Sequence, residues 1–134
     1  MKEKLVFIVE DDPMLSRMMS RMLEANGASF IIAHNLKDAM ELFETNKMNI
    51  SHILLDGSLT ERLPGQGLPP EAETLPLAKE IAKAEDFCGL VYPMSVILDY
   101  VEQLLTALGN KGVFLGECGK VDVLKHVITV IKKK

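Results

Sequence analysis

The feature that most constrains the fold is a repeated alternation between short apolar runs and longer amphipathic segments. The first run, Leu5–Val9, is apolar at every position, as in strands that are buried on both faces. We expect further strands at residues 30–33, 53–55, 88–92 and 112–115. We expect helices after Asp12, after Asn35, over 75–85, after Ser95 and over 120–131. This order predicts an α/β fold with a parallel sheet, right-handed crossovers and helices on both faces.

Length and composition limit the possible classes of protein. A chain of 134 residues fits one domain, and 48% hydrophobic with 25% charged residues is typical of a globular protein. The formal charge of −4 argues against non-specific nucleic-acid binding. No apolar stretch approaches the roughly 20 residues of a membrane-spanning helix. Cys88 and Cys118 are too few for a disulfide framework or a zinc site, and we expect both to be buried in a reducing, cytoplasmic compartment.

A long segment, Gly57–Thr74, interrupts the alternation. It is rich in glycine and proline, namely Pro64, Gly65, Gly67, Pro69 and Pro70. Loops of this length in compact domains are often functional.

Acidic residues follow the strands at what should be one edge of the sheet. Glu10 and Asp11 follow the first strand, and Asp56 follows the third. Ser95 and Glu117 follow the fourth and fifth strands. The carboxyl ends of parallel strands are where such sheets place their sites, so these side chains should converge. Converging carboxylates require a cation, and ligands that are all oxygen suit Mg²⁺. An aspartate in such a place can also accept a phosphoryl group.

Two segments carry a resemblance to a known family. Phe7–Pro13 reads FIVEDDP, the strand Ile53–Asp56 reads ILLD, and 56 − 11 = 45 residues separate the two aspartates. In these features the chain resembles the receiver domains of two-component response regulators, over residues 5–131. The resemblance implies a flavodoxin-like (βα)5 three-layer sandwich, with a five-stranded parallel sheet in the order 2-1-3-4-5. It also implies a single receiver-like domain over residues 1–134.

The resemblance assigns roles to individual residues. It implies that Glu10 and Asp11 hold Mg²⁺ together with Asp56, and that Asp56 is the phosphoacceptor. It implies that the backbone carbonyl of Ser58 is a further metal ligand. Ser95 matches the residue that hydrogen-bonds the phosphoryl oxygens and acts in the switch.

The chain departs from the family at the end of the fifth strand. Phe114 matches the switch aromatic but lacks a tyrosine hydroxyl. Counted from Ser95, the family's lysine position falls on Glu117, and Cys118 replaces the proline after it. Lys120, three residues later, either folds back as a substitute for that lysine or is a plain helix-start residue.

The predicted function is phosphorelay signalling. Asp56 would accept a phosphoryl group from a histidine kinase or phosphotransfer protein and switch a surface for a downstream effector or a self-dimer. That surface would be the face from the fourth to the fifth helix, without direct nucleic-acid or membrane binding. The chain would not be an enzyme beyond self-phosphorylation and self-dephosphorylation at Asp56. The alternative is a pseudo-receiver, an interaction module independent of phosphorylation, which Glu117 favours.

Other classes and local interpretations are weaker. A phosphatase of the haloacid-dehalogenase type needs a second aspartate two residues after Asp56, where Ser58 stands. Flavin binding is opposed by the acidic end of the first strand. Asp12 and Ser95 both suit helix N-caps. The apolar segment 96–108 is either a partly exposed partner surface or a deeply buried helix.

Overall fold

A parallel sheet forms the centre of the molecule. The computed structural model describes residues 5–59, 67, 69–116 and 118–132. Within them it contains four parallel strands, β1 (Leu5–Val9), β2 (Ser29–Ala33), β3 (Ile50–Leu55) and β4 (Leu90–Pro93). Their order across the sheet is β2-β1-β3-β4, as predicted for these four strands. The α/β class is therefore confirmed.

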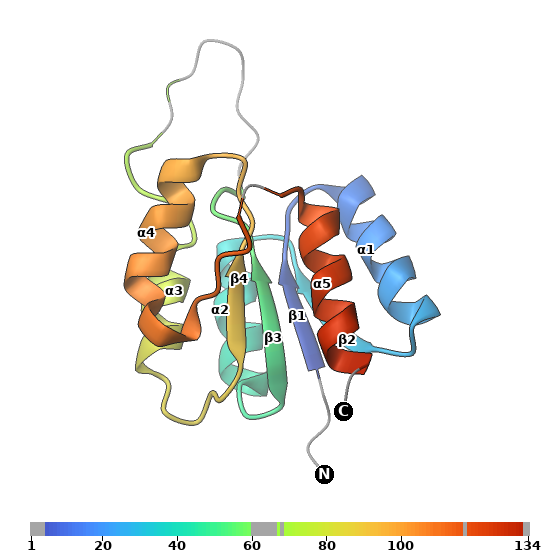
Figure 1. Cartoon of the computed structure of the whole chain (residues 1–134). Helices are drawn as coiled ribbons and strands as arrows, with labels where there is room; N and C mark the ends of the chain where they lie inside the picture. The colour runs from blue at the N-terminus through green and yellow to red at the C-terminus, as the bar shows by residue number, and fades with distance from the viewer. Residues whose placement is uncertain (1–4, 60–66, 68, 117, 133–134) are drawn as a thin grey trace.

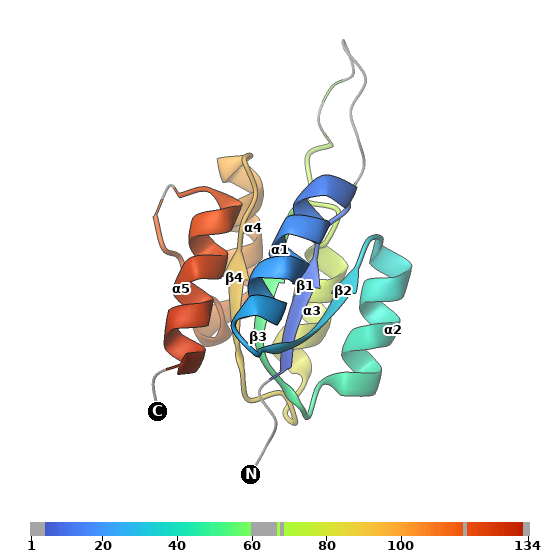
Figure 2. The same cartoon turned by 90° about the vertical axis from the view of Figure 1, so that its right-hand side faces the viewer.

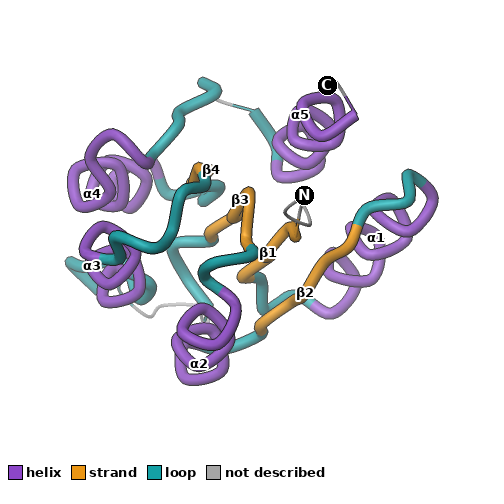
Figure 3. The backbone as a smooth tube through the Cα atoms, turned by 90° about the horizontal axis from the view of Figure 1, so that it is seen from below, coloured by secondary structure: helices purple, strands orange, loops and turns teal. Residues whose placement is uncertain are grey.

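In the described part of the chain, five α-helices cover the two faces of the sheet. They are α1 (Pro13–Ala25), α2 (Leu36–Asn46), α3 (Leu75–Lys83), α4 (Leu98–Leu108) and α5 (Lys120–Lys132). Figure 1 shows the helices around the strands, and Figure 2 shows α1 and α5 side by side. Seen from below, α1 and α5 lie on one face, and α2, α3 and α4 lie on the other (Figure 3). The predicted three-layer sandwich is confirmed.

The strands bury side chains on both faces, which explains their unbroken apolar sequence. In β1, Phe7 and Val9 belong to the core under α2, α3 and α4, whereas Val6 and Ile8 belong to the core under α1 and α5. All four side chains are fully buried. Because successive side chains of a strand point to opposite faces, one run of five residues supplies both cores.

Side-chain caps fix the starts of two helices. The Asp12 carboxylate accepts hydrogen bonds from the amides of Met14 and Leu15, at 2.9 and 3.3 Å. Asn35 accepts from the amide of Asp38 at 2.8 Å and caps α2. The Asp12 and Asn35 caps are as predicted.

The predicted Ser95 cap is wrong. α4 begins three residues later, at Leu98, and its N-cap residue, Ile97, makes no side-chain cap bond. The Ser95 hydroxyl instead accepts a hydrogen bond from the amide of Ile97 at 3.1 Å. This local turn competes with the first helical turn, which is a common behaviour of serine.

The predicted fifth strand is also wrong, since among the described residues the 112–115 segment makes only an isolated bridge, between Val91 and Gly112. Pro93 supplies a physical reason. The amide of Met94 donates to Leu55 of β3, so residue 93 faces the opposite edge, where Val91 accepts from Val113. Proline has no N–H to donate at that edge, and the ladder therefore stops after one bridge.

Exposure corrects further predictions. Cys88 and Cys118 are both exposed rather than buried, and both are free thiols. In the 96–108 segment, Val96 is 93% exposed while Tyr100 is buried, so the segment combines an exposed start with a buried helix face. Within the described residues, no helix combines the length and the apolar character needed to cross a membrane.

Candidate functional site

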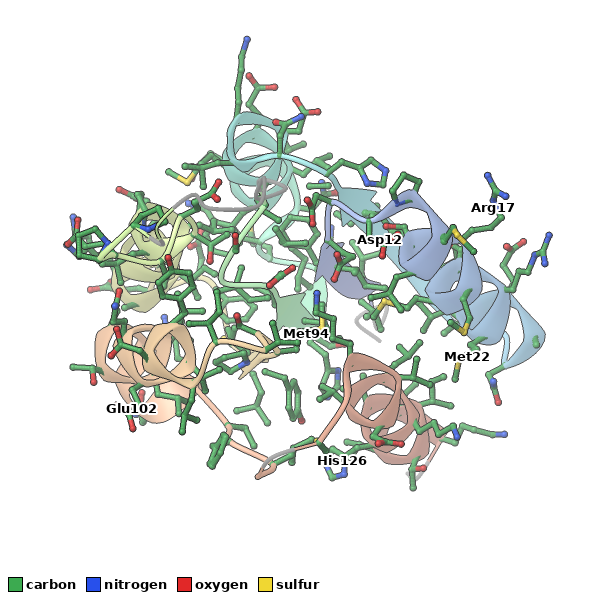
Figure 4. The ribbon with its side chains drawn as sticks, turned by 90° about the horizontal axis from the view of Figure 1, so that it is seen from above. Asp12, Arg17, Met22, Met94, Glu102 and His126 are labelled. Atoms are coloured by element: carbon green, nitrogen blue, oxygen red, sulfur yellow. The ribbon has the colours of Figure 1, made fainter. Side chains whose placement is uncertain are left out.

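The predicted acidic residues meet at the carboxyl edge of the sheet. Glu10 follows β1 and Asp56 follows β3; the two residues are 0% and 4% exposed, and Asp11 is half-buried. Ligand oxygens of Glu10, Asp11 and Asp56 all lie within 4.8 Å of one another. Figure 4 looks down on this edge, where Asp12 precedes α1 and Met94 follows β4. Parallel strands bring the three carboxylates together because the residues follow neighbouring strands.

Lys120 reaches into this cluster from the first position of α5. Its ammonium group donates to Glu10 Oε1 at 2.7 Å and to Asp56 Oδ2 at 2.8 Å. The sequence left two interpretations of Lys120 open, and in the structure its side chain folds back into the acidic site. Its ammonium group thus forms ion pairs with both buried carboxylates.

Burial dominates the electrostatics of the two carboxylates. It raises the pKa of Asp56 above its usual value, although hydrogen bonding and charge from Lys120 oppose this rise. It also raises the pKa of Glu10, again against the bond from Lys120. Burial lowers the pKa of Lys120, but its hydrogen bonds to Asp56 and Glu10 outweigh that effect, so the pKa stands above its ordinary value. The ammonium group of Lys120 thus only partly compensates the burial of the Glu10 and Asp56 carboxylates.

Contacts between side chains and backbone groups hold Asp56 and Glu10 in place. The amide of Ser58 donates to Asp56 Oδ1 at 3.2 Å, and the buried Thr74 hydroxyl donates to the Asp56 carbonyl at 2.7 Å. His34 Nδ1 lies 2.9 Å from the Glu10 carbonyl oxygen. Sequence reasoning missed Thr74 and His34. Their positions in the sequence could have indicated this role, because His34 follows a strand and Thr74 ends the segment after Asp56, so both reach the same edge of the sheet.

Ser95 lies close to Gly57, the residue that follows Asp56. A Cβ atom built on Gly57 would lie 3.3 Å from Ser95 Cβ and 2.9 Å from Tyr100 Cβ. Glycine is therefore favoured next to Asp56, because a side chain there would collide with Tyr100 and would press tightly against Ser95. Ser95 is placed at the site, and its hydroxyl is used by Ile97.

The Gly57–Thr74 segment returns to α4 through specific hydrogen bonds. Tyr100 donates to the Pro69 carbonyl at 2.6 Å. The Gln103 amide donates to the Pro70 carbonyl at 2.7 Å and accepts from the Ala72 amide at 2.8 Å. Sequence reasoning missed both α4 residues, because no local pattern links them to a loop some 30 positions earlier.

The remaining predicted residues are distributed around the site. Phe114 is 50% exposed and lines a cavity of about 440 Å³ together with Ser95, Leu98 and Cys118. Glu117 lies outside the described residues. The predicted role of the Ser58 carbonyl as a metal ligand stays a prediction.

The residues present fit a hard divalent cation. Glu10, Asp11 and Asp56 offer carboxylate oxygens only, which Mg²⁺ and Ca²⁺ prefer over softer ligands. Two of the three carboxylates are buried, so they are poorly hydrated and gain most from a compensating charge.

Comparison with solved structures identifies the fold. A signal receiver domain of a DNA-binding response regulator from Colwellia psychrerythraea 34H matches with a TM-score of 0.67 and 18% identity, over 98% of this chain and all of that one. A response regulator receiver domain from Bermanella marisrubri matches with a TM-score of 0.68 and 16% identity, over 98% and 100%. A response regulator from Burkholderia pseudomallei, solved with a phosphorylated aspartic acid, a calcium ion and citrate, matches with a TM-score of 0.66 and 15% identity, over 97% and 74%.

The chain therefore has the flavodoxin-like fold of response regulator signal receiver domains. No protein-family model matches the sequence, and no curated protein matches it.

Proposed function

We propose that this chain is a phosphoacceptor of a two-component phosphorelay, acting as one receiver-like unit over residues 1–134 in the cytoplasm. Asp56 accepts the phosphoryl group, and Glu10, Asp11 and Asp56, with the Ser58 carbonyl, hold Mg²⁺. The observation that carries the proposal is the contact of Lys120 with Asp56 at 2.8 Å inside a cluster of three carboxylates. The Lys120 ammonium group supplies the positive charge that Glu117 cannot supply.

The proposed reaction is a phosphoryl transfer between side chains. An Asp56 carboxylate oxygen attacks the phosphorus of a phosphohistidine; the P–N bond breaks, and the imidazole keeps the electron pair and takes up a proton. Bound Mg²⁺ would neutralise charge on the transferred group. Lys120 holds and orients the carboxylate, and the Ser58 amide fixes its other oxygen at 3.2 Å. No further catalytic activity is proposed beyond self-phosphorylation and self-dephosphorylation at Asp56.

The output of the proposed switch is the exposed face between α4 and α5. Val96, Leu98 and Phe114 are large apolar side chains exposed there, around the cavity that Ser95 also lines. Because Ser95 contacts both the acceptor region and this cavity, its movement toward a phosphoryl oxygen would alter the surface. A downstream effector or a second copy would bind this face.

The test is a Mg²⁺ titration followed by beryllofluoride, which mimics an acyl phosphate, monitored by amide NMR. The wild type should show saturable shifts at Asp11, Asp56 and Ser95 that are lost in Asp56→Ala. Asp86→Ala is the matched control, since this exposed aspartate precedes β4 at the other end of the strand. A wild type that binds Mg²⁺ but ignores beryllofluoride would contradict phosphoacceptance.

The second candidate function is a pseudo-receiver that binds partners without phosphorylation. Glu117 at the usual lysine position favours it, because a carboxylate there would repel a phosphoryl group. The same titration separates the two functions. A chain that responds to neither Mg²⁺ nor beryllofluoride would support the pseudo-receiver.

A further inference from the structure

Lys120 contacts one oxygen on each of two carboxylates that a metal ion in the acidic cluster would need. Its ammonium group lies 2.7 Å from Glu10 Oε1 and 2.8 Å from Asp56 Oδ2. These two residues belong to the three whose ligand atoms gather within 4.8 Å. The Glu10 and Asp56 side chains are 1% and 6% exposed, so water solvates them poorly and the ammonium group is their main compensating charge.

A lysine ammonium and a divalent cation that contact the same two carboxylates repel each other strongly. Both are cations, and they would lie a few ångströms apart in a site with little water to screen them. Lysine can yield, because its charge sits on a flexible chain of four carbons. The rigid carboxylates at the strand ends have less freedom to move.

We propose that Lys120 is a built-in competitor of the divalent cation, whose ammonium group leaves Glu10 when the metal binds. This inference rests on the proposed metal site at Glu10, Asp11 and Asp56. The competition lowers the metal affinity of the resting chain. It also makes the position of Lys120 depend on occupancy of the site.

The position of Lys120 in the fold gives this displacement a consequence. Lys120 is the first residue of α5, and the exposed Gly119 precedes it. Cys118, just before them, and Val123, one turn later, both line the cavity beside Phe114. Release of the Glu10 tether therefore loosens the start of α5 and the wall of that cavity. The occupancy of the metal site is in this way communicated to the exposed α4–α5 face.

The first experiment compares Mg²⁺ affinity by calorimetry in the wild type, Lys120→Gln and Lys125→Gln. Lys125 is the matched control, because it is exposed on the same helix and its replacement removes the same charge. Lys120→Gln should bind Mg²⁺ at least tenfold more tightly than the wild type. Lys125→Gln should stay within twofold of the wild type.

The second experiment needs no variant, and it decides the question if Lys120→Gln does not fold. The side-chain methylene signals of Lys120 in the wild type are followed by ¹H–¹³C NMR during the Mg²⁺ titration. They should shift with the same midpoint as the Asp11 amide.

The outcomes separate this inference from the proposed function. Equal or weaker Mg²⁺ binding by Lys120→Gln, or Lys120 signals that stay still while the Asp11 amide shifts, would overturn the competition and leave the metal site intact. Absence of Mg²⁺ binding by every variant would overturn the metal site itself, and the competition with it. Binding by Lys120→Gln alone would support the competition in its strongest form.

Discussion

The half of the chain that contains β1 to β3 differs from the half that contains β4 to α5 in what holds it together. In the first half, backbone ladders pair every strand, and the acidic residues follow from strand ends. In the second half, β4 pairs with β3, but the described residues on its other edge make only one isolated bridge, and side chains supply further links. Lys111, Lys120 and Gln103 each reach more than 25 residues away in sequence. The first half is thus joined mainly by backbone pairing, whereas the second half depends more on individual side-chain contacts.

The largest expected change in the free energy of unfolding concerns the buried core of the first half. Leu54 in β3 is fully buried under α1 and α5, so Leu54→Ala should lower the free energy of unfolding by about 3 kcal/mol. Phe114→Ala in the second half should change it by about 0.5 kcal/mol or less, because that side chain is half exposed. Urea unfolding at one pH measures both. Equal losses would contradict the contrast between the halves.

A somewhat smaller effect tests the side-chain links of the second half. The Lys111 ammonium donates to the carbonyls of Ile81 and Ala84 at 2.8 and 2.7 Å, which cap the end of α3, and it lies over the Phe87 ring. Lys111→Met should therefore cost about 1–2 kcal/mol of unfolding free energy. The exposed Lys125→Met is the control and should cost less than about 0.5 kcal/mol. A Lys111 variant as stable as this control would refute the link.

The two halves were not equally predictable from sequence. Apolar runs, caps and strand-end acids are local patterns, so Leu5–Val9, Asp12 and the cluster around Asp56 could be predicted. The prediction of a fifth strand failed because pairing of residues 112–115 needs an N–H at position 93, which proline lacks. Pro93 lies in β4, which is not adjacent to these residues in sequence. The hydrogen bonds of Lys120 to the acidic cluster and of Gln103 to residues 70 and 72 join segments that only the tertiary fold brings together, so no local sequence pattern predicts them.

A further prediction concerns the cost in stability of burying the Asp56 carboxylate. Burial raises the pKa of Asp56, so the folded chain holds a proton more tightly than the unfolded chain. Between the two pKa values the unfolded state binds fewer protons, and the free energy of unfolding therefore falls as pH rises through that window. Asp56→Asn should accordingly unfold at a higher urea concentration than the wild type at neutral pH without Mg²⁺.

This gain in stability should shrink as the pH falls from the raised pKa of folded Asp56 toward about 4, the ordinary range of aspartate, and it should be absent below that range. Urea unfolding in chelator at several pH values measures it, with Asp86→Asn as the exposed control. A gain that persists undiminished in acid would show that it comes from something other than the buried charge. Added Mg²⁺ should stabilise the wild type more than Asp56→Asn, since the variant lacks one of the proposed ligands.

The last substitution should change the free energy of unfolding least, and it is designed to restore the strand pairing that the second half lacks. Pro93→Val restores an N–H at the edge of β4 that faces the 112–115 segment. One new hydrogen bond contributes about 1 kcal/mol, and the loss of proline's restricted unfolded chain offsets most of it. The amides at positions 93 and 115 should then exchange more slowly with solvent, as the fifth strand pairs and the cavity beside Phe114 narrows. Pro76→Ala, at the exposed start of α3, should leave the exchange of Leu115 unchanged. If Leu115 exchanges at the wild-type rate in Pro93→Val, the missing donor does not explain the open edge, and the irregular second half must instead be held open by the side-chain contacts of Lys120 and α4.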